Sequence, residues 1–126
     1  MVIEEIIKRT VKQTIMELNE AERKKKPEKS AVEKTIELLE SYNDFKMSTD
    51  PNAQKLLEQI DDALKMIQSD PYYRIIPMRF FDHMTIWDIS GFFDVSEKTI
   101  VRRRKKLVRK LSCILFASDV IREILS

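Results

Sequence analysis

The sequence predicts an all-helical protein, and three observations support this prediction. The 126 residues include one glycine and four prolines, which leaves little material for hairpins and tight loops. Hydrophobic residues make up 43% of the chain, enough to bury a core. Apolar residues also recur every three to four positions over most of the sequence, which is the spacing of amphipathic helices. At this length we expect one or two compact units.

The N-terminal part contains two apolar stripes. The first stripe consists of Ile3, Ile7, Val11, Ile15 and Leu18. A charged segment containing Pro27 interrupts the pattern, because proline and its polar neighbours favour a break. The second stripe consists of Val32, Ile36, Leu39, Tyr42 and Phe45, and it ends near "MSTD". These stripes predict a helical N-terminal region over residues 1–48, with dimerisation as a candidate role beside the simpler role of closing the core.

Residues 49–126 are expected to form a second unit. Asp50 followed by Pro51 predicts a helix start, since Asp caps free amides and Pro is favoured at the first helical position. Asp70 and Pro71 repeat this signal before "YYRIIPMRFFDHM", which has the apolar density of a core helix. Pro77 removes one backbone donor and should bend or shorten that helix. "SDVIREILS" predicts a short closing helix at the end of the chain.

Between these segments the sequence predicts a helix-turn-helix. Thr85 can cap a helix of about nine residues that ends near Phe93, and Ser96 can cap a second helix that starts at Glu97. Asp94 occupies the turn position usually given to glycine, and Asp tolerates left-handed backbone geometry better than most residues. The apolar residues that should converge on the core of this motif are Ile86, Ile89, Phe93, Val95 and Ile100.

The second helix of the motif carries a strongly basic face. Seven of the nine residues from Arg102 to Lys110 are Lys or Arg. At 100° per residue, Ile100, Leu107 and Leu111 point to one side. The opposite side presents a basic stripe that consists of Lys98, Arg102, Lys105 and Arg109. Arg104 alone falls on the inner side, where its aliphatic stem can lie along apolar surface.

Charge is distributed unevenly along the chain. From Asp70 onward, eleven Lys and Arg stand against seven acids, a formal charge of +4, so residues 1–69 come to −2 of the total of +2. This asymmetry suggests that a polyanion binds to the C-terminal half. The residues expected to read base edges are Ser96, Glu97, Lys98, Thr99, Arg102 and Arg103. Those expected to contact phosphates are Lys105, Lys106 and Arg109.

The segment "YYRIIPMRFFDHMTIWDISGFFDVSEKTIVRRRKKLVRKLSCILF" resembles a known family. It looks like the DNA-binding region of phage-type transcriptional regulators of the ArpU and RinA kind, itself similar to the helix-turn-helix in region 4 of sigma factors. The resemblance covers about residues 70 to 118 and implies a sigma region 4-like domain that activates phage or prophage late genes. It also implies that Lys98 and Arg102 read bases.

We therefore expect a sequence-specific transcriptional regulator that inserts the helix starting at Glu97 into the major groove of double-stranded DNA. A homodimer would place two such helices about 34 Å apart, one turn of DNA. Two alternatives stay open: a sigma-like factor that acts only with RNA polymerase, and a helical protein-interaction module. The early charges and the lack of a long apolar run predict a cytoplasmic protein, in a bacterium or phage-infected host, without a membrane partner.

The remaining chemically active side chains predict no catalysis. His83 is the only histidine and has no cluster of ligands in the sequence, so we expect neither an enzyme nor a metal or cofactor site. Cys113 is expected to be a small buried thiol. The spacing of the aromatic residues predicts that they belong to the core. These aromatic residues are Tyr72, Tyr73, Phe80, Phe81, Trp87, Phe92 and Phe93.

Overall fold

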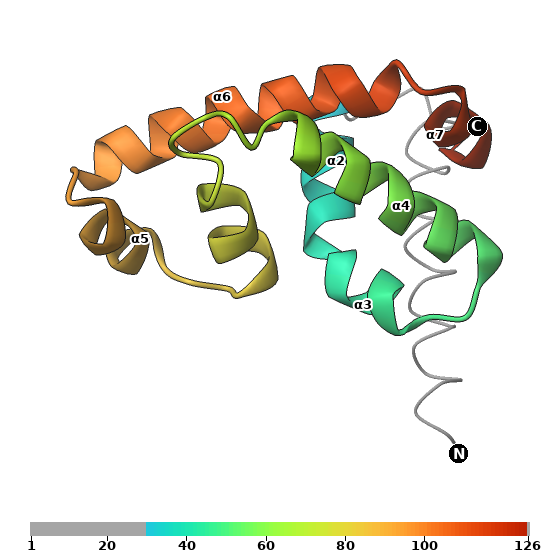
Figure 1. The fold of residues 1–126 in the computed structure, drawn as a ribbon, viewed down its shortest axis with the longest axis horizontal. Helices are drawn as coiled ribbons and strands as arrows, with labels where there is room; N and C mark the ends of the chain where they lie inside the picture. The colour runs from blue at the N-terminus through green and yellow to red at the C-terminus, as the bar shows by residue number, and fades with distance from the viewer. Residues whose placement is uncertain (1–29, 126) are drawn as a thin grey trace.

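The computed structural model describes residues 30–125, and every regular element in this range is helical. The elements are α2 (Ala31–Glu40), α3 (Tyr42–Met47), α4 (Pro51–Met66), the π-helix η1 (Pro77–Phe81), α5 (Ile86–Phe93), α6 (Glu97–Phe116) and α7 (Asp119–Leu125). Figure 1 shows the long helix α6 running along one side of the molecule, with α5 at its N-terminal end and α7 at its C-terminal end. The α-helical prediction is therefore confirmed for this part of the chain.

Helix α6 is the element on which most of the fold is assembled. It packs against α2, α4, α5 and α7 (Figure 1). Between residues 30 and 125, each helix is too short or too polar to cross a lipid bilayer. The first apolar stripe, the break at Pro27 and the proposed dimerising role of that stripe lie outside the described residues.

The N-terminal caps of α2 and α4 follow the capping chemistry of their sequences. Ser30 Oγ accepts a hydrogen bond from the Glu33 amide at 3.2 Å. Asp50 Oδ1 accepts one from the Asn52 amide at 2.8 Å, with Pro51 at the first helical position. Both caps satisfy amides that the first helical turn leaves without a carbonyl partner. The predicted start of a helix at Asp50 and Pro51 is confirmed.

The second apolar stripe forms two helices rather than one. Ser41 separates α2 from α3, with backbone angles of φ −91° and ψ 1° that end the regular helix. Leu38, Leu39 and Phe45 are fully buried. The predicted stripe is thus confirmed at Leu39 and Phe45, whereas Val32 and Ile36 are half-buried at the edge of the core.

The core is continuous across the boundary that the sequence suggested between residues 48 and 49. Phe45 of α3, Leu56 of α4 and Leu111 of α6 belong to the same cluster of buried side chains. Helices α2 and α6 also pack directly against each other. Within the described range, the two sides of that boundary therefore share one core.

The segment after Asp70 differs from the helix that the sequence predicts. Asp70 does accept a hydrogen bond from the Tyr72 amide at 2.8 Å, but the residues that follow form turns as far as Arg74. A π-helical turn starts at Pro77, and the Asp82 amide donates to the Pro77 carbonyl at 3.0 Å. Pro77 lacks a backbone donor, so it fits the start of this turn and not the middle of a long α-helix. Its predicted shortening of the helix is confirmed.

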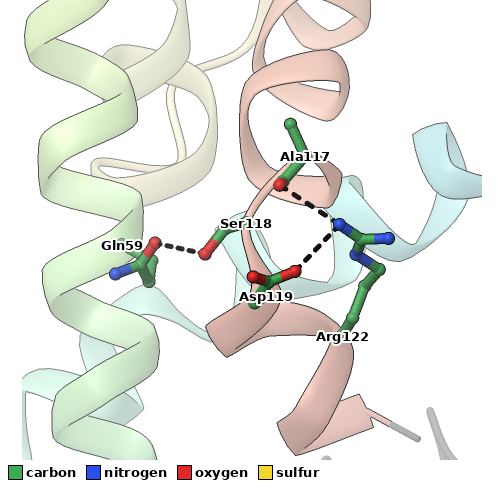
Figure 2. A network of polar contacts seen from close by, with 5 residues as sticks. All are labelled: Gln59, Ala117, Ser118, Asp119 and Arg122. Atoms are coloured by element: carbon green, nitrogen blue, oxygen red, sulfur yellow. Dashed lines mark hydrogen bonds and ion pairs between the residues drawn. The ribbon is translucent and has the colours of Figure 1, made fainter.

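The C-terminal end is closed by α7, as the sequence predicts. Ile121 and Leu125 of this helix are buried. Figure 2 shows the polar contacts at its start, where Ser118 Oγ donates to Gln59 Oε1 of α4 at 2.9 Å. Arg122 donates to Asp119 at 3.0 Å and to the Ala117 carbonyl at 3.4 Å. The Ser118 contact ties the end of α6 to α4, and the Arg122 contacts link the start of α7 to the end of α6.

Tyr42 provides a test of the packing between α3 and α4. Its hydroxyl donates to Asp61 Oδ1 at 2.6 Å, and its ring stacks on Phe81 with 3.9 Å between centroids. Burial, together with the hydrogen bond and charge of Asp61, raises the pKa of Tyr42 from 10.0 to about 12. Because the pKa is raised in the folded state, this contribution to stability is present below pH 10.0 and is lost as pH rises toward about 12.

An absorbance titration of the phenolate should therefore show one tyrosine that ionises near pH 12. We expect Tyr42→Phe to remove this step and to make the free energy of unfolding less dependent on pH in the same range. A titration that is identical in the wild type and in Tyr42→Phe would show that the hydrogen bond to Asp61 is absent in solution.

Candidate nucleic-acid interface

Helices α5 and α6, the two helices of the predicted helix-turn-helix, are joined by a tight, ordered turn. The Thr85 hydroxyl caps α5 by accepting from the Asp88 amide at 3.1 Å. At the other end of α5, Asp94 adopts the left-handed conformation, with φ 54° and ψ 47°. The Asp94 amide donates to Gly91 O and the Val95 amide to Ser90 O, which is the hydrogen-bond pattern of a Schellman motif. The predicted Thr85 cap and left-handed Asp94 are confirmed.

Ser96 begins α6 as the sequence predicts. Its hydroxyl accepts a hydrogen bond from the Thr99 amide at 3.2 Å and lies 2.9 Å from the Thr99 hydroxyl. Glu97 follows as the first helical residue, where a carboxylate is stabilised by the positive end of the helix dipole. The Ser96 and Thr99 hydroxyls thus bond each other at the exposed N-terminal end of the helix.

The two faces of α6 separate as the helical wheel predicts. Ile100, Leu107 and Leu111 are buried, with at most 1% of their surface exposed. On the opposite side, all four members of the basic stripe have exposed side chains. Lys106 is exposed beside them, and the predicted base readers Glu97 and Lys98 are exposed at the start of the helix. The structure therefore gathers the basic stripe and Lys106 on one accessible surface.

Arg103 is placed differently from the rest of the predicted base-reading set. Its guanidinium carbon lies 4.8 Å from the centroid of the Tyr72 ring, and its Nε is buried without a hydrogen-bond partner. Tyr72 in turn packs against Phe93 of α5, with 5.2 Å between ring centroids. Arg103 therefore ties α6 to the turn after Asp70 through a cation–π contact, instead of projecting toward solvent with Arg102.

Arg104 lies on the inner side of α6, as predicted, and it is half-buried. It lines a cavity between α2, η1 and α6, together with Arg79 and residues of α2. Burial, and then the positive charge of Arg79, lowers the pKa of the Arg104 guanidinium. Lys110, further along α6, contacts Asp70 through an ion pair of 3.8 Å.

Two aromatic side chains of the motif are exposed, contrary to the sequence-based expectation. Trp87 is 72% exposed and Phe92 is 55% exposed. Trp87 lies on the side of α5 opposite the buried Ile89, whereas Phe92 follows Ile89 by three residues and lies at the edge of the same face. A helical wheel drawn for α5 alone would have placed Trp87 outside the core, but it does not by itself predict the exposure of Phe92. The spacing of the aromatic residues over the whole segment did not distinguish these two exposed side chains from the buried ones.

The other two candidate residues show no reactive arrangement. Cys113 is an exposed free thiol, so its predicted burial is wrong; it lies on the side of α6 away from Leu111 and Leu115. His83 is exposed and has a left-handed backbone with φ 55°. Among residues 30–125, no group of three or more metal-binding side chains comes together.

No protein-family model, curated protein or solved structure matches the chain. The resemblance to phage regulators therefore stays a prediction from the residues.

Proposed function

We propose that the chain is a sequence-specific transcriptional regulator that binds double-stranded DNA through α6. The observation that supports this proposal is the exposed basic stripe on a helix whose opposite face is buried and whose start is fixed by a tight turn. A helix of this kind fits the width of the major groove, with its N-terminal turns nearest to the bases.

The proposal gives different roles to the two ends of the stripe. Lys98 and Arg102 lie in the first two turns of α6 and are exposed, so they are the side chains we propose to contact base edges, with Ser96, Glu97 and Thr99 beside them. Lys105, Lys106 and Arg109 lie further along and would contact phosphates. Arg103, packed on Tyr72, is assigned to positioning α6.

The decisive experiment is selection of bound sequences from a random duplex library, followed by footprinting with purified protein. We expect enrichment of a defined site and a symmetric footprint if the protein binds as a homodimer. Activation of phage or prophage late genes, as the resemblance implies, would then be tested with a reporter that carries the selected site. If the selected duplexes show no common sequence, the protein does not read DNA sequence. The remaining candidate would then be a helical interaction module with a basic face.

Lys105→Ala tests the proposed phosphate contacts. We expect affinity to fall evenly for specific and random duplexes, and the slope of log affinity against log salt to decrease by about one, because one fewer counterion is released. Lys55→Ala on α4 is the matched control, since it also removes an exposed lysine, away from the basic stripe. Loss of binding to the specific site alone would contradict the assignment of Lys105 to a phosphate.

A second candidate function is a sigma-like factor that binds promoters only with RNA polymerase. The exposed Trp87 and Phe92 favour it, because large apolar side chains exposed beside a DNA-binding helix suit a protein partner. Adding polymerase to the footprinting assay separates the candidates. Specific protection by the purified protein alone supports the regulator, whereas protection only with polymerase supports the sigma-like factor.

A further inference from the structure

The cavity between α2, η1 and α6 has the composition of a binding site for a small molecule. Its volume is about 690 Å³, within the range of ligand pockets. Apolar side chains of Val32, Ile36, Phe80 and Val108 form one part of its lining. Phe80 and Val108 are buried, whereas the α2 residues are half-buried. The apolar part can therefore receive the hydrocarbon portion of a ligand.

The polar part of the cavity is strongly cationic. Its charged side chains are Arg79, Arg104, Lys105, Arg109 and Glu40, four cations against one carboxylate, with His83 beside them. Arg79 is held in place by a hydrogen bond of 3.1 Å to the Met84 carbonyl. None of the ion pairs found within residues 30–125 joins Arg79 or Arg104 to a carboxylate. The lining therefore carries an excess of positive charge over the one carboxylate of Glu40.

Two of these cations lie where an anion is most strongly favoured. Arg79 and Arg104 are both half-buried, and the positive charge of Arg79 adds to burial in lowering the pKa of Arg104. An anion placed between two guanidinium groups relieves this repulsion and accepts hydrogen bonds from both. The exposed lysine and arginine of α6 lie at the same cavity and add further attraction.

We propose that this cavity binds a small amphiphilic anion, with its carboxylate or phosphate group at Arg79 and Arg104 and its hydrocarbon part against Val32, Ile36, Phe80 and Val108. Lys105 and Arg109 also belong to the basic stripe. On the basis of the proposed function, such a ligand therefore lowers DNA affinity by drawing two phosphate-binding side chains toward the cavity.

Calorimetric titration with octanoate tests the binding site without DNA. We expect octanoate to bind the wild type more tightly than octan-1-ol, which lacks the charge, and more tightly than inorganic phosphate, which lacks the hydrocarbon. Arg104→Gln should weaken octanoate binding by about 10- to 100-fold, the loss typical of a hydrogen bond to a charged group. Arg74→Gln, an exposed arginine that does not line the cavity, should bind octanoate as the wild type does.

A second variant tests the position of the hydrocarbon part. Ile36→Trp should fill the cavity from α2 and abolish octanoate binding, while circular dichroism confirms that the helices are retained. Absence of octanoate binding to the wild type would overturn the proposal. Equal binding of octanoate and octan-1-ol, or equal weakening by Arg104→Gln and Arg74→Gln, would also overturn it.

The effect on DNA is measured separately with the selected duplex. We expect octanoate to weaken duplex binding by the wild type but not by Ile36→Trp. Octanoate binding that leaves duplex affinity unchanged would overturn only the regulatory step. Failure of the protein to bind any duplex specifically would overturn the proposed function and leave the calorimetric result as it stands.

Discussion

Replacing Leu111 with alanine is expected to lower the free energy of unfolding by about 2–5 kcal/mol, the range for large-to-small substitutions in a packed core. Leu111 is fully buried on the inner face of α6, in the cluster that also contains Phe45 and Leu56. The loss has two parts, the removal of apolar surface from the core and the cavity that remains when neighbouring helices cannot close around alanine.

Chemical denaturation followed by circular dichroism measures this effect. Met66→Ala is a suitable control, because Met66 is also a large apolar residue but is 68% exposed, and its replacement should change stability by no more than about 0.5 kcal/mol. If both variants lose similar stability, Leu111 is not in the core and the orientation of α6 is wrong. In that case the orientation of α6 would no longer support an exposed basic stripe.

Arg102→Ala is expected to relax recognition at one base pair, at a cost of about 1–3 kcal/mol for the preferred base. Arg102 is exposed in the second turn of α6, so its removal should leave folding unchanged. A guanidinium at this position can donate two hydrogen bonds to a guanine in the major groove, and alanine can donate none.

Binding to the selected duplex and to its single base-pair variants measures the effect. In Arg102→Ala, one position of the site should tolerate all bases while the others keep their preference. Arg74→Ala, which removes an exposed arginine outside α6, should leave the whole profile unchanged. A uniform loss on specific and random duplexes would assign Arg102 to a phosphate instead of a base.

Local chemistry made much of the motif predictable. The caps at Thr85 and Ser96 depend on a hydroxyl and an amide three residues apart, and the turn depends on one residue that tolerates a positive φ. The buried and exposed faces of α6 follow from its period of 3.6 residues. Such signals are contained within a few neighbouring residues, so they can be read without knowing the tertiary structure.

Features that depend on contacts between distant residues could not be predicted in the same way. The packing of Arg103 on Tyr72 joins residues 31 positions apart. The helical wheel places Arg103 on the flank of α6 beside the stripe that contains Arg102, but it does not identify Tyr72 as the partner. The π-helical turn at Pro77 packs against α2, α3 and α5, which lie far from it in the sequence or follow it. The cavity combines residues of three separate elements, so no local sequence pattern predicts it.

Because α6 is long and uninterrupted, a small tilt at one of its ends moves the other end over a large distance. Its 20 residues span about 30 Å at 1.5 Å per residue. A tilt of about 10° around the end held by Ser118 and Gln59 would displace the first turn by about 5 Å, close to the pitch of the helix. If α6 binds DNA as proposed, small changes at this distant end should therefore shift which bases its first turn reaches, although no residue of that turn has changed.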